Sequence, residues 1–242
     1  MTITTSGETH NRLQRAYCEH AISDTIRPRE SRHVTRQLDR VMRVAPIAPD
    51  DRVLEVGCGM GRFTMRMAAR GARVEGLDLS PVLLDRFRAL NAGQFDIPLH
   101  CADVMAPPPH LLNRFDVVVG CFVLHHVQDV AEAVEGMSRM LKSGGRLVLL
   151  EANAYTPLFY LQILTTPGMT WAGDKGMTRM RPGLVSRAMA RAGMTRFGLT
   201  RFGVFPAAVN DRAWGTRLDA ALDRVPLPAV CRAFQIFVAH RA

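Results

Sequence analysis

The stretch Val53-Leu54-Glu55-Val56-Gly57-Cys58-Gly59-Met60-Gly61-Arg62-Phe63 decides the fold. Its first residues suit a β-strand, its glycines have the spacing G-x-G-x-G, and a helical segment follows them. Glycine allows the chain to turn sharply, and it lets backbone N–H groups approach a ligand where a Cβ atom would block them. The stretch therefore predicts a strand, a ligand-binding turn and a helix in succession.

The spacing of the glycines separates this turn from two other glycine-rich turns. A dinucleotide-binding fingerprint has the spacing G-x-G-x-x-G, and a phosphate-binding P-loop ends in Gly-Lys-Ser or Gly-Lys-Thr. Neither pattern is present at residues 57–63. Phosphate cradling is therefore the weaker interpretation of the turn, and an NAD-dependent oxidoreductase is a distant alternative.

Outward from this turn, short apolar segments alternate with helical segments between residues 52 and 151. This rhythm predicts an α/β fold in which a doubly wound, Rossmann-like, mostly parallel sheet is covered by helices on both faces. Two further strand-like segments, 195–205 and 232–241, would pair as an antiparallel edge, with a helix near 212–225 between them. Together with the five strands of the alternating part, they predict a seven-stranded sheet.

Acidic residues stand at the ends of the second and third predicted strands. Asp78 follows the glycines at about the distance, ~20 residues, at which an acidic residue meets a ribose in nucleotide-binding α/β folds. Asp103 ends the next strand, where a carboxylate would accept a hydrogen bond from an adenine amino group. The carboxyl ends of parallel strands meet at one edge of the sheet. The three strand ends therefore point to one crevice that suits a nucleoside.

These residues resemble the class I S-adenosylmethionine (SAM)-dependent methyltransferases of the small-molecule type, over residues 52–153. The Leu-Lys-Pro-Gly-Gly turn of that family has its counterpart at residues 141–145, where Ser143 stands in place of proline. The resemblance implies that SAM is the cofactor. It assigns ten residues to the SAM site: Glu55, Gly57, Cys58, Gly59 and Gly61 in the glycine-rich motif, Asp78 and Leu79 at the ribose, Asp103 and Val104 at the adenine, and Cys121 near the methionine moiety.

The resemblance also implies a domain arrangement and a function. Residues 1–50, with an amphipathic helical segment at 27–45, would form an N-terminal helical lead-in or lid. Residues 51–242 would form the SAM-binding methyltransferase domain, with a substrate-side insertion at 152–181. The expected reaction transfers a methyl group to an O, N or S atom of a small, partly apolar metabolite. An RNA methyltransferase and a catalytically silent SAM-binding regulatory domain are the alternatives.

Polar and aromatic residues beyond the fourth and fifth strands are candidates for the acceptor side. His125 and His126 follow the fourth strand, where one of them would act as a general base or merely hydrogen-bond the backbone. Glu151 and Asn153 leave the fifth strand and would either face the acceptor or cap a turn. Two tyrosines complete the substrate candidates: Tyr155 after the fifth strand, and Tyr17 in the N-terminal lead-in. The apolar segment 155–171 would enclose the acceptor, pack against the sheet or join a second subunit in a homo-oligomer.

Composition and charge limit the remaining classes of protein. The 242-residue chain is 48% hydrophobic and 22% charged, which is typical of a globular protein rather than a disordered one. Its net charge of +9 comes mostly from residues 151–242, where twelve Lys or Arg residues outnumber five Asp or Glu residues. No aromatic stacking platform or RNA-binding module accompanies these cations, so a solvated face is expected rather than a nucleic-acid partner.

Cysteine usage and hydropathy indicate the compartment. The five cysteines are odd in number and form no C-x-x-C pair, which predicts reduced thiols and no metal site. No apolar run approaches the ~20 residues that cross a bilayer, and the N-terminus lacks the apolar core of a secretory signal. The sequence therefore predicts a cytoplasmic protein without a membrane span.

Overall fold

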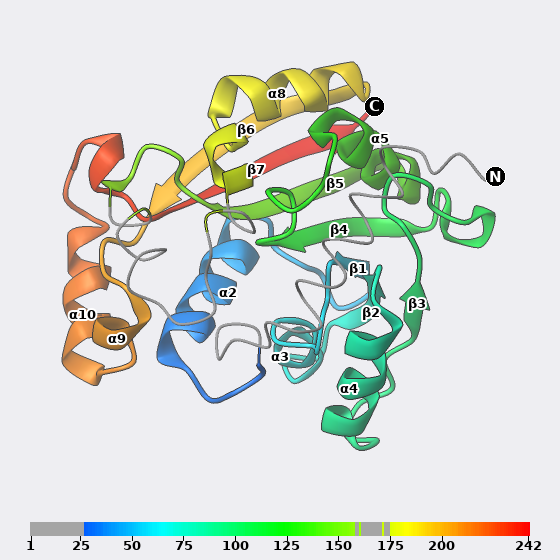
Figure 1. Ribbon diagram of the computed structural model, residues 1–242, viewed down its shortest axis with the longest axis horizontal. Coiled ribbons are helices and arrows are strands. Elements are labelled where there is room, and N and C mark those ends of the chain that lie inside the picture. Colours follow the sequence, from blue (N-terminus) through cyan, green and yellow to red (C-terminus); the bar gives the residue numbers. More distant parts are fainter. Residues whose placement is uncertain (1–26, 158–159, 161–170, 172–174) are drawn as a thin grey trace.

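The computed structural model describes residues 27–157, 160, 171 and 175–242, and a single sheet organises them (Figure 1). The order of its seven strands is β3-β2-β1-β4-β5-β7-β6. The strands are β1 (Arg52–Val56), β2 (Arg73–Asp78), β3 (Leu99–Cys101), β4 (Phe115–Cys121), β5 (Leu141–Ala152), β6 (Met194–Phe202) and β7 (Phe234–Arg241). Because β1 lies between β2 and β4, the glycine-rich turn that follows it is central in the sheet.

The strand directions match the predicted fold class. The pairs from β3 across to β5 are all parallel, whereas β7 runs antiparallel to both of its neighbours, β5 and β6. The predicted doubly wound, mostly parallel, seven-stranded sheet with an antiparallel C-terminal pair is confirmed. β7 lies between β5 and β6, so β6 forms the edge and runs in the same direction as β5.

Helices cover both faces of this sheet. In β5, Leu147 and Leu149 belong to the core on one face, and Val148 and Leu150 belong to the core on the other. This alternation is what a sheet buried on both sides requires. Figure 1 shows α5 and α8 on one side of the sheet and α2 and α3 on the other. The helices are α2 (Arg32–Val44), α3 (Thr64–Ala68), α4 (Pro81–Asn91), α5 (Val130–Met140), α8 (Pro182–Arg191), α9 (Ala207–Asn210) and α10 (Ala213–Leu222), with 3₁₀ turns η1 (Pro109–Leu111), η2 (Lys175–Arg179) and η3 (Ala229–Cys231).

Capping side chains set where the helices begin. At α2, Ser31 Oγ accepts a hydrogen bond from Val34 N at 3.2 Å. At α4, Ser80 Oγ accepts one from Leu83 N at 3.2 Å, and Pro81 stands in the first turn. The cap at Ser31 satisfies a backbone N–H group that a helix start leaves unpaired. It explains why α2 begins at Arg32 and not at residue 27, where the predicted helical segment starts.

α2 is part of the core rather than an appendage. Its residues Val34, Leu38 and Val41 are at most 4% exposed and pack with sheet residues such as Val119 and Leu150. The apolar side of this helix is thus the side that contacts the sheet, and Arg36 and Arg40 lie over the ring of Phe202 in β6.

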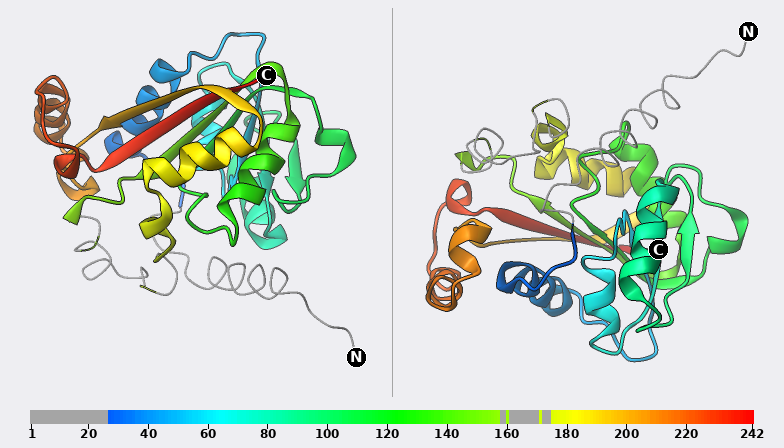
Figure 2. Two further views of the ribbon diagram at one scale, coloured as in Figure 1. Left: turned by 90° about the horizontal axis from the view of Figure 1, so that it is seen from above. Right: turned by 60° about the horizontal axis from the view of Figure 1, so that its bottom comes forward.

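A small helical lobe follows β6. α9 and α10 lie at an outer end of the molecule, and α10 packs against α9 and α2 (Figure 2). Because β6 runs in the same direction as β5, this lobe is attached at the side of the sheet where the carboxyl ends of β1, β4 and β5 also lie. In the part of the chain that the structure describes, no helix combines the length and the apolar character that crossing a membrane requires.

Candidate functional site

The glycine-rich turn after β1 combines close packing with open space. Gly57, Gly59 and Gly61 have φ angles of 70°, 51° and 86°, in the left-handed region that favours glycine. A Cβ atom on Gly57 would lie 2.4 Å from the Val123 side chain, and one on Gly61 would lie 2.6 Å from Phe87. At Gly59 no atom of the described residues beyond its chain neighbours lies within 4 Å of that position. Gly57 and Gly61 therefore allow close packing, and Gly59 leaves room beside its backbone.

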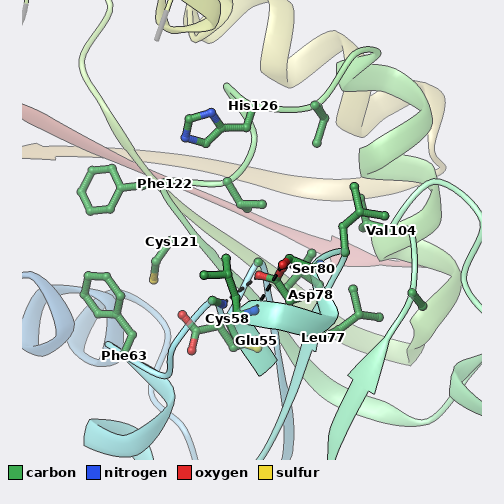
Figure 3. Close-up of a pocket in the computed structure, with 18 of the residues that line it drawn as sticks. Glu55, Cys58, Phe63, Leu77, Asp78, Ser80, Val104, Cys121, Phe122 and His126 are labelled. Carbon is green, nitrogen blue, oxygen red and sulfur yellow. Dashed lines mark hydrogen bonds between the residues drawn. The ribbon is translucent and has the colours of Figure 1, made fainter. Parts of the chain in front are cut away.

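β2 brings a carboxylate to this turn. β1 and β2 pair in parallel with Val56 opposite Leu77, so Asp78 lies next to the glycines. Asp78 Oδ2 accepts a hydrogen bond from Gly59 N at 2.8 Å, and its Oδ1 accepts one from Ser80 N at 2.9 Å (Figure 3). The two backbone donors fix the carboxylate, while each of its oxygens can accept a further hydrogen bond. The turn thus presents an oriented anionic acceptor on the wall of a pocket.

Glu55 is a second acid on the pocket wall, and it is 1% exposed. Thr64 Oγ1 donates a hydrogen bond to Glu55 Oε2. Burial raises the pKa of Glu55 to about 8, and the Asp78 carboxylate adds to this rise, whereas the Thr64 hydrogen bond and the Arg62 charge oppose it. Near neutral pH this carboxyl group is therefore mostly protonated, and a bound cation would favour its ionised form.

The raised pKa of Glu55 makes protein stability depend on pH. Above the ordinary pKa of 4.5 the unfolded chain releases a proton that the folded chain retains up to about pH 8. The contribution of Glu55 to the free energy of unfolding should therefore fall as the pH rises through this window, by on the order of a few kcal/mol, and Glu55→Gln should remove this contribution. Urea unfolding at the two ends of the window measures the effect. If the wild type and Glu55→Gln lose the same free energy of unfolding between the two pH values, the raised pKa is contradicted. Exposed Asp85→Asn is the control variant.

One pocket brings together most of the residues that the sequence assigns to the SAM site. Nine of them line it: Glu55, Gly57, Cys58, Gly59, Asp78, Leu79, Asp103, Val104 and Cys121. The tenth, Gly61, lies beneath the turn against Phe87 and is not part of the lining. Figure 3 shows Val104 on one side of Asp78, and Cys121, Phe63 and Phe122 on the other. The pocket therefore has a central acid with an apolar region on each side.

The region around Phe122 is walled by aromatic rings. Phe122 follows β4 with φ 58°, an unusual conformation for a bulky residue and one that often marks a functional site. Its ring centroid lies 6.2 Å from that of Phe63 and 5.9 Å from that of Phe234. Phe63 and Phe122 line the pocket, and Cys121 beside them is a buried thiol whose pKa is raised by burial. This wall would accommodate an apolar or aromatic group.

The two histidines after β4 take different positions. His126 lines the pocket, whereas His125 is 6% exposed and does not. His125 Nδ1 lies 2.7 Å from Glu151 Oε2, and Glu151 Oε1 accepts a hydrogen bond from Leu124 N at 2.7 Å. The His125 and His126 rings are 4.0 Å apart between centroids. Buried Glu151 therefore fixes His125, and His125 supports the ring that faces the pocket.

The other acceptor-side candidates lie away from the pocket. Asn153 Nδ2 donates hydrogen bonds to Ala229 O at 2.7 Å and Arg232 O at 2.8 Å, which is the turn-forming alternative for this residue. Tyr155 is 47% exposed, and its backbone N–H group binds Asn153 Oδ1 at 3.2 Å. Tyr17 lies outside the described residues. Of the arginines after residue 151, Arg179 turns inward and donates to three backbone carbonyls, His125 O included.

Arg62, Phe63 and Phe122 are among the lining residues that were not sequence candidates. Arg62 and Phe63 directly follow the glycines, and Phe122 directly follows Cys121. Their positions next to assigned residues are the signal that would have found them. Because neighbours in a strand point to opposite faces, only the left-handed turn at Phe122 brings its side chain to the pocket together with Cys121.

Comparisons with known proteins agree with this geometry. The family described as a methyltransferase domain matches residues 54–149. The chain is 33% identical to ubiquinone biosynthesis O-methyltransferase of Xylella fastidiosa over 132 residues, 53% of this chain and 52% of that protein. It is 36% identical to 27-O-demethylrifamycin SV methyltransferase of Amycolatopsis mediterranei over 119 residues, 48% of this chain and 43% of that protein. The chain thus spans about half the length of these curated relatives.

Solved structures share the fold over more of the chain. A possible histamine N-methyltransferase of Thermotoga maritima covers 96% of this chain and 95% of its own, with TM-score 0.62 and 16% identity. Phosphoethanolamine N-methyltransferase 2 of Haemonchus contortus, solved in complex with S-adenosyl-L-methionine, covers 86% of this chain and 52% of its own, with TM-score 0.60 and 15% identity. The sheet, with the pocket at its carboxyl edge, has a Rossmann-like α/β fold. More closely, the match of residues 54–149 to the methyltransferase-domain family confirms the predicted resemblance to the class I SAM-dependent methyltransferases.

Proposed function

We propose that this chain transfers a methyl group from SAM to a small, partly apolar metabolite. The observation that carries the proposal is the pocket, in which an oriented Asp78 carboxylate lies between an apolar region at Val104 and an aromatic wall at Phe122. The methyl group of SAM, when bound, is already electrophilic because its sulfur is positively charged. The protein must chiefly hold the reacting atoms in line, and such orientation contributes roughly 7–11 kcal/mol.

The residues of the pocket fit SAM along its length. Asp78 would accept hydrogen bonds from the ribose hydroxyls, and Val104 with Leu79 would contact the adenine. Asp103, whose Oδ1 accepts a hydrogen bond from Met105 N at 2.9 Å, would lie near the adenine amino group. The open position at Gly59 leaves room for the ligand beside the backbone. Glu55, mostly protonated by itself, would ionise near the positively charged methionine moiety.

The acceptor would occupy the aromatic wall. Phe63 and Phe122 favour a ring or another apolar group, and the curated relatives are named as an O-methyltransferase of ubiquinone biosynthesis and a 27-O-demethylrifamycin SV methyltransferase. These names support a hydroxyl as the methylated group. His126 faces the pocket next to this wall and would take the hydroxyl proton as methyl transfer proceeds. His125 and Glu151 would act as positioning residues for His126.

The alternatives have less support. Inward-turned Arg179 cannot follow a phosphate backbone, and the relatives named above act on small molecules rather than RNA. The proposed reaction takes place in the cytoplasm, which stays a prediction from the sequence. The division into a lead-in at 1–50 and an insertion at 152–181 also stays a prediction, because much of both segments lies outside the described residues.

Label transfer tests the proposal. The protein is incubated with methyl-labelled SAM and an extract of the source cells, and the extract is then separated into low-mass metabolites, RNA and protein. Label in the metabolite fraction, lost with Asp78→Ala, is the expected result. Label in nuclease-sensitive material would favour the RNA alternative. Tight SAM binding without label in any fraction would favour the regulatory alternative.

A further inference from the structure

Helix α10 buries its acids and exposes its apolar residues, the reverse of an ordinary surface helix. The side chains of Asp219 and Asp223 are 0% and 2% exposed. By contrast, Trp214 is 57% exposed, Leu218 is 44% exposed and Val225, in the turn that continues the helix, is 44% exposed. Figures 1 and 2 show this helix at an outer end of the molecule.

Ion pairs and backbone donors hold the acidic side inward. Arg36 of α2 pairs with Asp219 at 3.0 Å and also with Asp223, which Arg40 contacts as well. Asp219 Oδ1 accepts a hydrogen bond from Val204 N at 2.7 Å, and Asp223 Oδ1 accepts one from Gly203 N at 2.9 Å. Because these partners satisfy both carboxylates, they fix the rotation of α10 and leave its apolar side facing outward.

The outward residues form one ridge. Trp214 and Leu218 are four residues apart and share a side of the helix, and exposed Val225 follows the end of the helix at Leu222. We call Trp214, Leu218 and Val225 the α10 ridge. Apolar side chains gathered on one helix side in this way mark a surface that binds a partner.

Cations flank the α10 ridge. Arg217 and Arg224 of the same segment are exposed, and Arg212 directly precedes the helix. Beside the ridge, a groove between α2 and α10 is lined by six arginines, Arg224 among them, and by only four acids. The surface therefore combines protruding apolar side chains with an excess of positive charge.

The combination of apolar side chains and positive charge distinguishes two possible partners, a second copy of the chain and a lipid bilayer. In a symmetric dimer the same patch of both copies meets, so the excess positive charge of one copy would be brought against that of the other. A bilayer that contains anionic lipid instead attracts the arginines and accepts Trp and Leu side chains at its interface. We propose that the α10 ridge docks this protein on the surface of an anionic phospholipid membrane.

The position of the α10 ridge gives this docking a use. α10 follows β6, whose carboxyl end lies at the same edge of the sheet as the pocket, and the turn around Asn153 joins β5 to the segment after α10. Docking through the α10 ridge would therefore bring this edge of the sheet near the lipid, where an apolar acceptor accumulates. The inference goes beyond methyl transfer, and its test needs neither SAM nor an acceptor.

Sedimentation with lipid vesicles tests the proposal on the full 242-residue chain. The chain should bind vesicles of phosphatidylglycerol and phosphatidylcholine but not vesicles of phosphatidylcholine alone, and added salt should weaken binding. Leu218→Asp should lower the partition coefficient at least tenfold, because burial of one large apolar side chain accounts for that factor. Arg217→Glu with Arg224→Glu should do the same.

Matched variants on another helix keep the test specific. Leu184 of α8 is 46% exposed, so Leu184→Asp introduces the same change at equal exposure, and Arg187→Glu with Arg191→Glu introduces the same charge change. These controls should bind as the wild type does. In a Trp171→Phe background, Trp214 emission should shift to the blue on binding. The proposal would be overturned if the chain does not bind the vesicles, or if the α8 controls lose as much binding as the α10 variants. It would also be overturned if the chain self-associates through Leu218, as shown by loss of self-association in Leu218→Asp, and does not bind vesicles.

Discussion

Replacing Asp78 with alanine should weaken SAM binding roughly 10²–10⁴-fold, because hydrogen bonds to a charged group contribute about 1.5–3 kcal/mol each and the ribose offers two hydroxyls. The geometry supports this expectation. Gly59 N and Ser80 N orient the carboxylate at 2.8 and 2.9 Å, so it would meet the ribose without rearrangement. The dissociation constant of SAM, measured by calorimetry, gives the result.

A ligand cycle separates ribose contact from damage to the turn. S-adenosylhomocysteine and its 2′-deoxy counterpart are compared on the wild type and on Asp78→Ala. If Asp78 holds the ribose, removal of the hydroxyl should weaken binding to the wild type but have little effect on the variant. Exposed Asp85→Ala should bind both ligands as the wild type does. If the missing hydroxyl weakens binding equally in the wild type and in Asp78→Ala, Asp78 does not contact the ribose.

His126→Ala should lower kcat by about 10²–10⁴-fold, the usual contribution of a general base, and leave the dissociation constant of SAM nearly unchanged. His126 lies on the pocket wall, and His125, held by Glu151 at 2.7 Å, supports its ring. The assay uses the labelled metabolite fraction as acceptor. Raising the pH should restore part of the activity of the variant, because a hydroxyl that ionises by itself no longer needs a base.

Two further variants distinguish base catalysis from packing. Glu151→Gln should reduce kcat by a smaller factor than His126→Ala, since Glu151 acts through His125. Exposed His110→Ala is the matched control and should have full activity. The proposed base role of His126 would be contradicted if His126→Ala retains wild-type kcat. It would also be contradicted if the variant loses activity equally at every pH and loses SAM affinity as well.

Local patterns were sufficient to predict the sheet and one end of the pocket. The glycine spacing, the acids at successive strand ends and the parallel topology together predict that Gly59, Asp78 and Asp103 meet, the family resemblance adds Glu55, and all four line one pocket. This works because the carboxyl ends of parallel strands coincide in space whatever the details of packing. The same reasoning placed the C-terminal strands as an antiparallel pair, but not β7 inside the sheet.

Contacts between distant segments were beyond the sequence pattern. The wall position of Phe122 depends on a left-handed backbone that a phenylalanine seldom adopts. The role of Asn153 depends on the carbonyls of Ala229 and Arg232, more than seventy residues further along the chain. The inverted orientation of α10 depends on Arg36 of α2. Such pairings have no local signature, because they arise only when the chain has folded.

The place of β7 between β5 and β6 has a consequence for biosynthesis. Of the described strands, only β7 neighbours β6, yet the ribosome makes Met194–Phe202 before Phe234–Arg241. While the intervening helices are being translated, β6 has no strand to pair with, and the outer side of β5 also remains open. Unpaired strands are templates for aggregation and take longest to fold when their partners are distant. The nascent chain should therefore depend on chaperones most in this interval.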